Sequence, residues 1–389
     1  MELNNNECIK IQSALAESEE RFRQMADMAG EWLWEQDAKG YYSYCSNAVR
    51  QILGYSPEEL IGKHYTQLLT AKDQLNQQSY ADTQQAFYGL INHYRHKNGH
   101  LIQTESTGLP IRDNNGQLLK WRGVDRDITA RKAAEKQMRA AEVKLAVAQH
   151  EIHIAQKIQA SLLPALPIKH ANFVVTGLCL PADQIGGDYF DYFFSGEDCL
   201  DLVIADVSGH SIGPALFMVE ARSVIRTQAT RLLTASQMLS LLNNFLYADL
   251  NHADYFITLF YLKYDLKTQY LSYANAGHPP PLLLRQGATH CERLDADGLI
   301  LGISEQIAFE EKKVLLAAGD LLLIYTDGLI EAENAQGEFF GLSRLIHRFT
   351  CYASYAPEQI MTQLLEELRQ FCHPKVFQDD ISLMVFKHL

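Results

Sequence analysis

The feature that most constrains the fold is a series of apolar, strand-like runs after residue 168. Helical stretches alternate with these runs, near residues 213–230, 234–249 and 357–372. The runs at 255–264 and 269–275 are joined by only a short link, which favours antiparallel pairing. We therefore predict one mixed α+β domain over residues 168–389.

Four aspartates lie at the ends of these runs or in glycine-rich turns: Asp188, Asp206, Asp327 and Asp379. Each one alone could be only a turn residue or a solvated strand end. Gathered at one sheet edge, however, they would repel one another unless cations lay between them. Oxygen-only ligands suit magnesium or manganese. Two such ions about 4 Å apart can activate a water and stabilise a phosphoryl group during its transfer.

The aspartates lie in motifs that occur in a fixed order, including IGGDYFDYF, LVIADVSGHSIGPAL, LLLIYTDGLIEAEN and DDISLMVF. Residues 168–389 resemble the metal-dependent PPM serine/threonine phosphatases, specifically their bacterial SpoIIE-type branch. This resemblance implies an α-β-β-α sandwich with two manganese or magnesium ions between the sheets. It also implies hydrolysis of phosphoserine or phosphothreonine by metal-activated water, without a phosphoenzyme.

The resemblance assigns a role to each acidic residue in turn. Asp206 matches the aspartate that bridges both ions, and the carbonyl of Val207 is a further ligand. Asp188 matches a ligand of one ion, while Asp327 and Asp379 match the remaining acidic ligands. These five residues form the predicted metal site.

Several neighbouring residues are assigned supporting roles. His210 is a candidate general acid because histidine titrates near neutral pH, although a role in the turn or in a substrate loop is the alternative. Asp191 and Asp380 are expected to hold waters and orient ligands. We expect His278 to be a structural hydrogen-bonding residue. Ser211 departs from the family pattern, which usually has glycine there, and the phosphate-clamping arginine of eukaryotic relatives has no clear counterpart.

Residues 18–130 carry the signals of a smaller α+β domain. The segment YSPEEL supplies an N-cap serine, a proline at the first helical position and a glutamate that closes a capping box. Asn-Gly pairs at 98–99 and 115–116 separate apolar runs and predict three antiparallel strands. With GYSPEELIG and the closing RGVDRDIT, this region resembles a PAS sensor domain. The sequence does not identify the PAS ligand.

Between the two regions, nine residues from Ala134 to Leu162 recur alternately four and three residues apart. This spacing is a heptad seam, and four of its nine members are alanine, so a self-standing coiled coil would be weak. We predict a signalling helix and coiled-coil linker over 131–163 that forms a homodimer through residues 134–162. The alternative is a single amphipathic helix lying on its own domain. Pro164 and Pro167 end the helix.

The leading interpretation is a PAS-regulated protein phosphatase. For this family and architecture, the resemblance implies a phosphoserine on a STAS-domain anti-sigma-factor antagonist as substrate, as in partner-switching stress responses. One alternative is a sensor histidine kinase, since AQHEIHIAQ resembles a phosphoacceptor helix, but the rest of the chain lacks a glycine-rich ATP lid. The other alternative is an inactive phosphatase fold kept as a binding module, against which the four acidic ligands argue.

The composition limits which partners and which cellular location we expect. The net charge of −13 disfavours a nucleic-acid partner, because a phosphate-binding face needs clustered Lys and Arg. No apolar run approaches the roughly 20 residues that span a bilayer, and the N-terminal segment lacks the apolar core of a signal peptide. The seven cysteines include no C-x-x-C pair, so neither a zinc site nor a disulfide framework is indicated. We therefore expect a cytoplasmic protein with no membrane partner.

Overall fold

The computed structural model describes residues 5–209, 212–231 and 233–389. The chain divides into two compact units, Met1–Leu145 and Ala146–Leu389.

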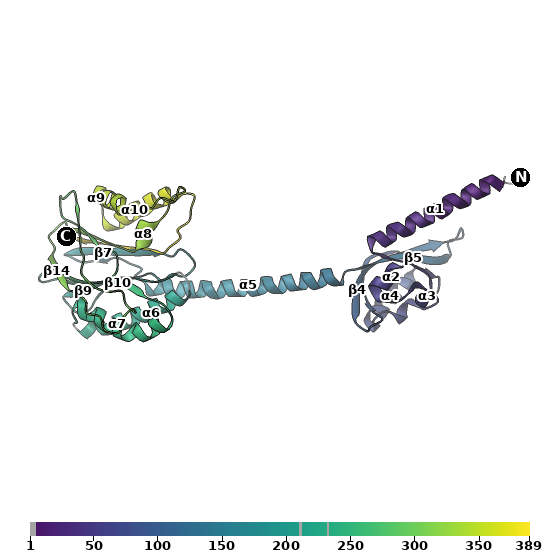
Figure 1. The fold of residues 1–389 in the computed structure, drawn as a ribbon, viewed down its shortest axis with the longest axis horizontal. Helices are drawn as coiled ribbons and strands as arrows, with labels where there is room; N and C mark the ends of the chain where they lie inside the picture. The colour runs from purple at the N-terminus through teal and green to yellow at the C-terminus, as the bar shows by residue number, and fades with distance from the viewer. Residues whose placement is uncertain (1–4, 210–211, 232) are drawn as a thin grey trace. The chain divides into compact units, whose positions relative to one another are not determined.

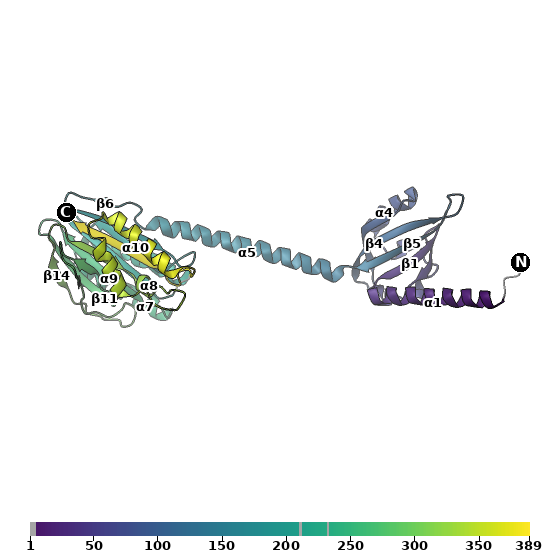
Figure 2. The ribbon, with the colours of Figure 1, turned by 90° about the horizontal axis from the view of Figure 1, so that it is seen from above.

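The first unit contains one five-stranded antiparallel sheet in the order β2-β1-β5-β4-β3. Its strands are β1 (Trp32–Asp37), β2 (Tyr42–Cys45), β3 (Phe87–Arg95), β4 (Leu101–Arg112) and β5 (Leu118–Asp127). The helical elements that precede β5 in the chain are α1 (Asn5–Ala29), α2 (Ala48–Leu53), α3 (Pro57–Leu60), η1 (Tyr65–Gln67) and α4 (Ala71–Thr83). The views in Figures 1 and 2 place α1 and α4 on opposite faces of this sheet.

Local sequence signals account for much of this unit. The two Asn-Gly turns join β3 to β4 and β4 to β5, and both pairs of strands are antiparallel as predicted. The predicted capping box at the start of α3 is confirmed, because Ser56 N donates to the Glu59 carboxylate at 2.9 Å. Trp32 and Trp34 are both buried in the core, where Trp34 Nε1 donates to the buried Asp125 at 2.8 Å.

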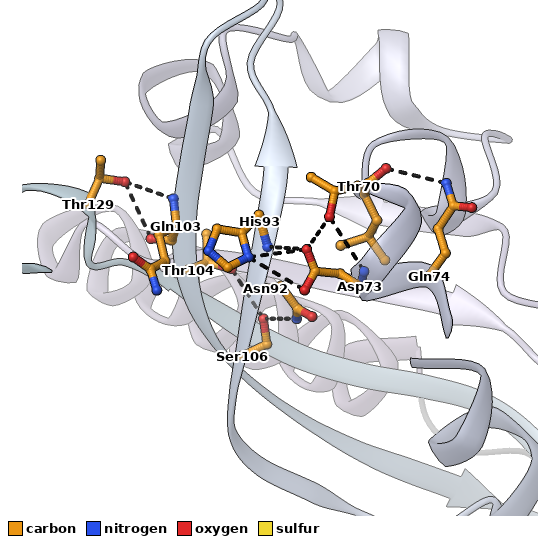
Figure 3. A network of polar contacts seen from close by, with 10 residues as sticks. Thr70, Asp73, Gln74, Asn92, His93, Gln103, Thr104, Ser106 and Thr129 are labelled. Carbon is orange, nitrogen blue, oxygen red and sulfur yellow. Dashed lines mark hydrogen bonds and ion pairs between the residues drawn. The ribbon is translucent and has the colours of Figure 1, made fainter. Parts of the chain in front are cut away.

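A polar network on β3 and β4 connects the sheet to the helices beside it (Figure 3). Asp73 of α4 accepts from the backbone N–H of His93 on β3 at 3.1 Å and also lies 3.2 Å from the His93 ring nitrogen Nδ1. On β4, the backbone N–H of Gln103 donates to the hydroxyl of Thr129 at 2.8 Å. Thr129 is the first residue of α5 (Thr129–Leu162), so α5 begins attached to β4.

The predicted long helix is present as α5, and it ends at Leu162, two residues before Pro164. Most residues between 131 and 151 are exposed, among them the seam residues Met138 and Leu145. The seam position Gln159 is instead buried.

The second unit is built on two sheets, one in the order β14-β11-β10-β9-β8 and the other in the order β13-β12-β15-β16-β7-β6. The strands are β6 (Ile168–Lys169), β7 (Phe173–Leu180), β8 (Tyr189–Phe194), β9 (Cys199–Val207), β10 (Ile257–Asp265), β11 (Tyr270–Ala276), β12 (Leu282–Leu284), β13 (Cys291–Arg293), β14 (Lys312–Leu315), β15 (Leu321–Tyr325) and β16 (Ile381–His388). The helical elements are α6 (Ile212–Gln228), η2 (Ala229–Arg231), α7 (Ala235–His252), α8 (Asp327–Glu331), α9 (Leu342–Cys351) and α10 (Pro357–Cys372). The short link after residue 265 joins β10 to β11 in antiparallel register, as predicted.

Three apolar layers hold the second unit together. One lies between the first sheet and helices α6 and α7, the second lies between the two sheets, and the third lies between the second sheet and helices α9 and α10. Figure 1 shows the resulting order of helices, sheet, sheet and helices. The predicted α-β-β-α sandwich is therefore confirmed. None of the helices in residues 5–209, 212–231 and 233–389 combines the length and apolar character needed to cross a membrane.

Candidate metal centre

The four predicted acidic ligands come from both sheets of the second unit. Asp188 lies directly before β8 and Asp206 is the penultimate residue of β9, so both belong to the first sheet. Asp327 opens α8 just after β15, and Asp379 lies two residues before β16, so these two belong to the second sheet. A site made by these residues lies where the ends of the two sheets meet.

Hydrogen bonds join the two sheets at this point. The hydroxyl of Thr326, which follows β15, donates to Oδ2 of Asp188 at 2.9 Å, and these residues are 138 positions apart in the chain. Asp380 reaches in the same direction, because its carboxylate accepts from the N–H of Gly187 at 2.7 Å and from the N–H of Ala182 at 2.8 Å. Asp380 therefore holds the turn that carries Asp188.

The carboxylates raise one another's pKa. Burial raises the pKa of Asp188 well above its usual range, and the charges of Asp206 and Asp380 raise it further. Burial also raises the pKa of Asp206 to about 7, with additional contributions from Asp327, Asp379 and Asp380. Mutual effects of this kind require short distances between charges. These aspartates therefore influence one another's ionisation, although they lie far apart in the sequence.

Glu331 extends the acidic group from α8. Burial raises its pKa, and the charges of Asp327 and Asp379 raise it further. The pKa of Asp327 is itself raised by burial and by Asp379. Asp327 and Glu331 are four residues apart on one helix, a spacing that places both side chains on the same face.

Two glycines allow the backbone to come close to this group. A Cβ atom at Gly187 would lie only 2.4 Å from the carbonyl oxygen of Val207. A Cβ atom at Gly328 would lie 2.0 Å from the carbonyl oxygen of Asp380. Any larger residue at either position would force these segments apart.

The residues present fit hard divalent cations in their chemistry. Every candidate donor is an oxygen atom, either a carboxylate or the carbonyl of Val207, and magnesium and manganese prefer such donors. Within the residues that the structure describes, no three His, Cys, Asp or Glu side chains are close enough together to hold an ion by themselves. The raised pKa values nevertheless mean that ionising these buried carboxylates is unfavourable without a compensating positive charge, which a bound cation would supply.

The structure gives Asp191 a different role from the expected one. Both of its oxygens are ion-paired with Arg226 of α6, at 2.6 and 2.7 Å, and the hydroxyl of Tyr189 donates to it at 2.7 Å. Asp191 therefore connects β8 to α6, and its carboxylate is fully engaged there.

His278 lies behind the acidic group and joins the two sheets. Its Nδ1 lies 2.8 Å from the hydroxyl of Thr258, which pairs with Asp206 across β9 and β10, and its Nε2 lies 3.2 Å from the carbonyl oxygen of Tyr325. Burial lowers the pKa of His278 to about 3, so the ring is neutral. The expected structural role is confirmed. His210 and Ser211 lie outside the described residues.

Sequence reasoning did not identify Thr326, Glu331 or Gln159 as part of this site. Thr326 is the first residue of the TDG motif and Glu331 lies three residues after it, so proximity in sequence could have indicated them. Gln159 was assigned only to the heptad seam. Its side chain instead hydrogen-bonds Gly186, 27 residues away, a contact that no local pattern predicts.

Comparison with known proteins agrees with this architecture. Residues 196–389 match the family model of stage II sporulation protein E (SpoIIE), and residues 42–125 match a PAS fold. The SiaA-PP2C domain of Pseudomonas aeruginosa has the same fold, with a TM-score of 0.57 and 20% identity over 64% of this chain and 99% of that domain.

Two curated relatives come from Bacillus subtilis (strain 168). The phosphoserine phosphatase RsbU is 29% identical, over 61% of this chain and 70% of its own length. The phosphoserine phosphatase RsbP is 28% identical, over 46% of this chain and 45% of its own length.

Proposed function

We propose that the chain, in which residues 42–125 match a PAS fold and residues 196–389 match the SpoIIE family model, hydrolyses phosphoserine or phosphothreonine on a protein under the control of the PAS region. The observation that carries this proposal is the acidic group at the junction of the two sheets. Asp188, Asp206, Asp327 and Asp379 supply it; burial raises the pKa of Asp206, and the charges of Asp327 and Asp379 raise it further.

Within this proposal, Asp206 would bind both of two manganese or magnesium ions, and the carbonyl of Val207 would be an additional ligand. Asp188 would bind one of the ions, and Asp327 and Asp379 would be the remaining acidic ligands. The bound ions would supply an activated water and would neutralise charge on the phosphoryl group during its transfer.

The protein's own residues keep the ligands in place. Thr326 donates to Asp188, and Asp380 holds the backbone of the preceding turn through Gly187. His278 fixes the spacing of the two sheets beneath the site through Thr258 and the carbonyl of Tyr325. His210 remains our candidate for protonating the departing serine oxygen.

For the substrate, we infer a phosphorylated STAS-domain protein in the cytoplasm, acting in partner switching. RsbU and RsbP, which are named phosphoserine phosphatases, support the phosphoserine part of this inference. The STAS-domain part follows from the resemblance in architecture: a PAS sensor at 18–130, a helical linker at 131–163 and a phosphatase domain at 168–389.

The experiment that tests this function measures phosphate release by the full-length chain from a STAS-domain protein phosphorylated on serine. We expect release that requires manganese or magnesium and stops when a chelator is added. The same protein phosphorylated on histidine serves as a control and should remain intact. Absence of metal-dependent release from phosphoserine, phosphothreonine and aryl phosphates alike would contradict the proposed activity.

We also propose that two copies of the chain associate through residues 134–162. Met138 and Leu145 are 66% and 60% exposed, although both are large apolar residues at seam positions of α5. A second α5 packed along the same seam would cover them.

We expect Leu145→Glu to convert a dimer into a monomer in sedimentation experiments, because a charge would have to be buried in the seam. Ala146→Glu adds the same charge one residue further on, outside the seam, and should leave the dimer intact. Equal sedimentation of the two variants would exclude this interface.

A further inference from the structure

The C-terminal end of α5 is attached to the turn that precedes Asp188. Gln159 is only 8% exposed, and its side-chain amide pairs with both polar backbone atoms of Gly186. Its Nε2 donates to the Gly186 carbonyl oxygen at 2.6 Å, and its Oε1 accepts from the Gly186 N–H at 3.3 Å. By contrast, Gln149 on the same helix is exposed.

The turn held by Gln159 is also held from its other side. The next residue, Gly187, donates its N–H to the carboxylate of Asp380 at 2.7 Å and lies against the carbonyl of Val207. Gly186 and Gly187 are thus fixed by α5 and by the segment before β16, and Asp188 follows directly. The position of the Asp188 carboxylate depends on both attachments.

The pairing requires α5 to lie in one rotational setting. Successive residues of an α-helix are turned by about 100°, so a rotation by one position would carry the Gln159 amide away from Gly186. Other contacts fix the same helix end: Arg222 Nε of α6 donates to the Leu162 carbonyl at 2.9 Å, and Leu163 packs against two of the apolar layers. The amide pair is therefore a contact that α5 makes in this packing and loses in a rotated one.

We propose that Gln159 is a positioning residue through which α5 holds the Gly186–Asp188 turn in its metal-binding geometry. This inference rests on the proposed function, because it concerns the same metal centre. It identifies the contact by which a change in the packing of α5 alters that centre. Gln159 does not touch the substrate, and its effect is exerted through the backbone of Gly186.

The test compares the full-length wild-type chain with Gln159→Ala, Gln159→Met and the matched control Gln149→Ala. Calorimetric titration with Mn²⁺ alone measures metal affinity without any substrate. We expect both Gln159 variants to bind Mn²⁺ about 10- to 100-fold more weakly, the usual cost of removing a group that orients a metal ligand. The control should bind as the wild type does. Raising the Mn²⁺ concentration should restore turnover of the Gln159 variants.

Gln159→Met separates hydrogen bonding from packing, because methionine fills a similar space without an amide. Wild-type Mn²⁺ affinity in this variant would overturn the proposal. Hydrogen exchange on the wild-type chain provides a test that needs no variant: the Gly186 amide should be protected, and exchange at the rate of an open loop would also overturn it.

The two proposals fail in different ways. If the wild-type chain neither binds Mn²⁺ nor hydrolyses phosphoserine, the proposed function is wrong. If the wild type does both and the Gln159 variants match Gln149→Ala, only the role of Gln159 is wrong.

Discussion

Asp206→Asn is expected to lower metal-dependent turnover of a phosphoserine substrate by at least about a hundredfold, the scale of losing one group that stabilises the transition state. Asp206 is the only one of the four aspartates assigned to both ions. It is also the aspartate whose pKa is influenced by Asp327, Asp379 and Asp380 together. Phosphate release under saturating Mn²⁺ measures the effect.

The same substitution should not unfold the second unit. Because burial and neighbouring carboxylates raise the pKa of Asp206 to about 7 from an ordinary 3.8, its ionisation opposes folding. This cost is absent below about pH 4 and grows as the pH rises through 7. Without metal at pH 8, calorimetry should therefore show Asp206→Asn melting at or above the temperature of the wild type.

Asp254→Asn is a matched control, because Asp254 is an exposed residue of the same unit at a left-handed backbone position that asparagine also accepts. This variant should retain full activity. Undiminished turnover by Asp206→Asn, in a preparation in which the control is active, would exclude the proposed metal site.

The sequence predicted those parts of the second unit that depend on short-range patterns. Apolar runs indicated the strands, and the resemblance carried by the ordered motifs implied the sandwich. Helix α9 was not predicted as a helix. The contact between Thr326 and Asp188 could not be predicted, because it joins residues 138 positions apart through the packing of two sheets.

In the first unit too, features set by short stretches of sequence were predicted, and features that depend on the rest of the fold were not. Asn-Gly turns and a capping box depend on the residues within them, and they predicted the three-strand segment and the start of α3 correctly. Helix α1 was not predicted, and its large apolar residues Ile11, Leu15 and Phe22 are 61%, 58% and 59% exposed in the structure. From its spacing alone, Gln159 was predicted to lie in the heptad seam. In the structure it is buried, and its side chain is hydrogen-bonded to Gly186.

Lowering the pH from 8 to 5 is expected to stabilise the first unit, although acid usually destabilises proteins. The reason is Asp125, which is fully buried and whose Oδ2 has no hydrogen-bond partner. Burial raises its pKa from an ordinary 3.8 to about 6, and hydrogen bonding, chiefly from Trp34, opposes this rise only in part. The folded state therefore favours the neutral acid.

The direction of the change in stability with pH follows from proton linkage. Between about pH 4 and pH 6 the folded state binds more protons at Asp125 than the unfolded state, so stability falls as the pH rises. A pKa difference of about two units corresponds to roughly 3 kcal/mol, or about a hundredfold in the folding equilibrium. Asp125→Asn should remove this dependence, since the amide stays neutral and its oxygen can still accept from Trp34.

Tryptophan fluorescence isolates the effect, because all three tryptophans of the chain, Trp32, Trp34 and Trp121, lie in the first unit. At pH 8 the Asp125→Asn variant should unfold at a higher denaturant concentration than the wild type, and the two curves should converge near pH 4. Asp82→Asn, at an exposed position of the same unit, should follow the wild type at every pH. If Asp125→Asn were less stable than the wild type at pH 8, the buried carboxylate would have to be charged and paired with a group inside the first unit.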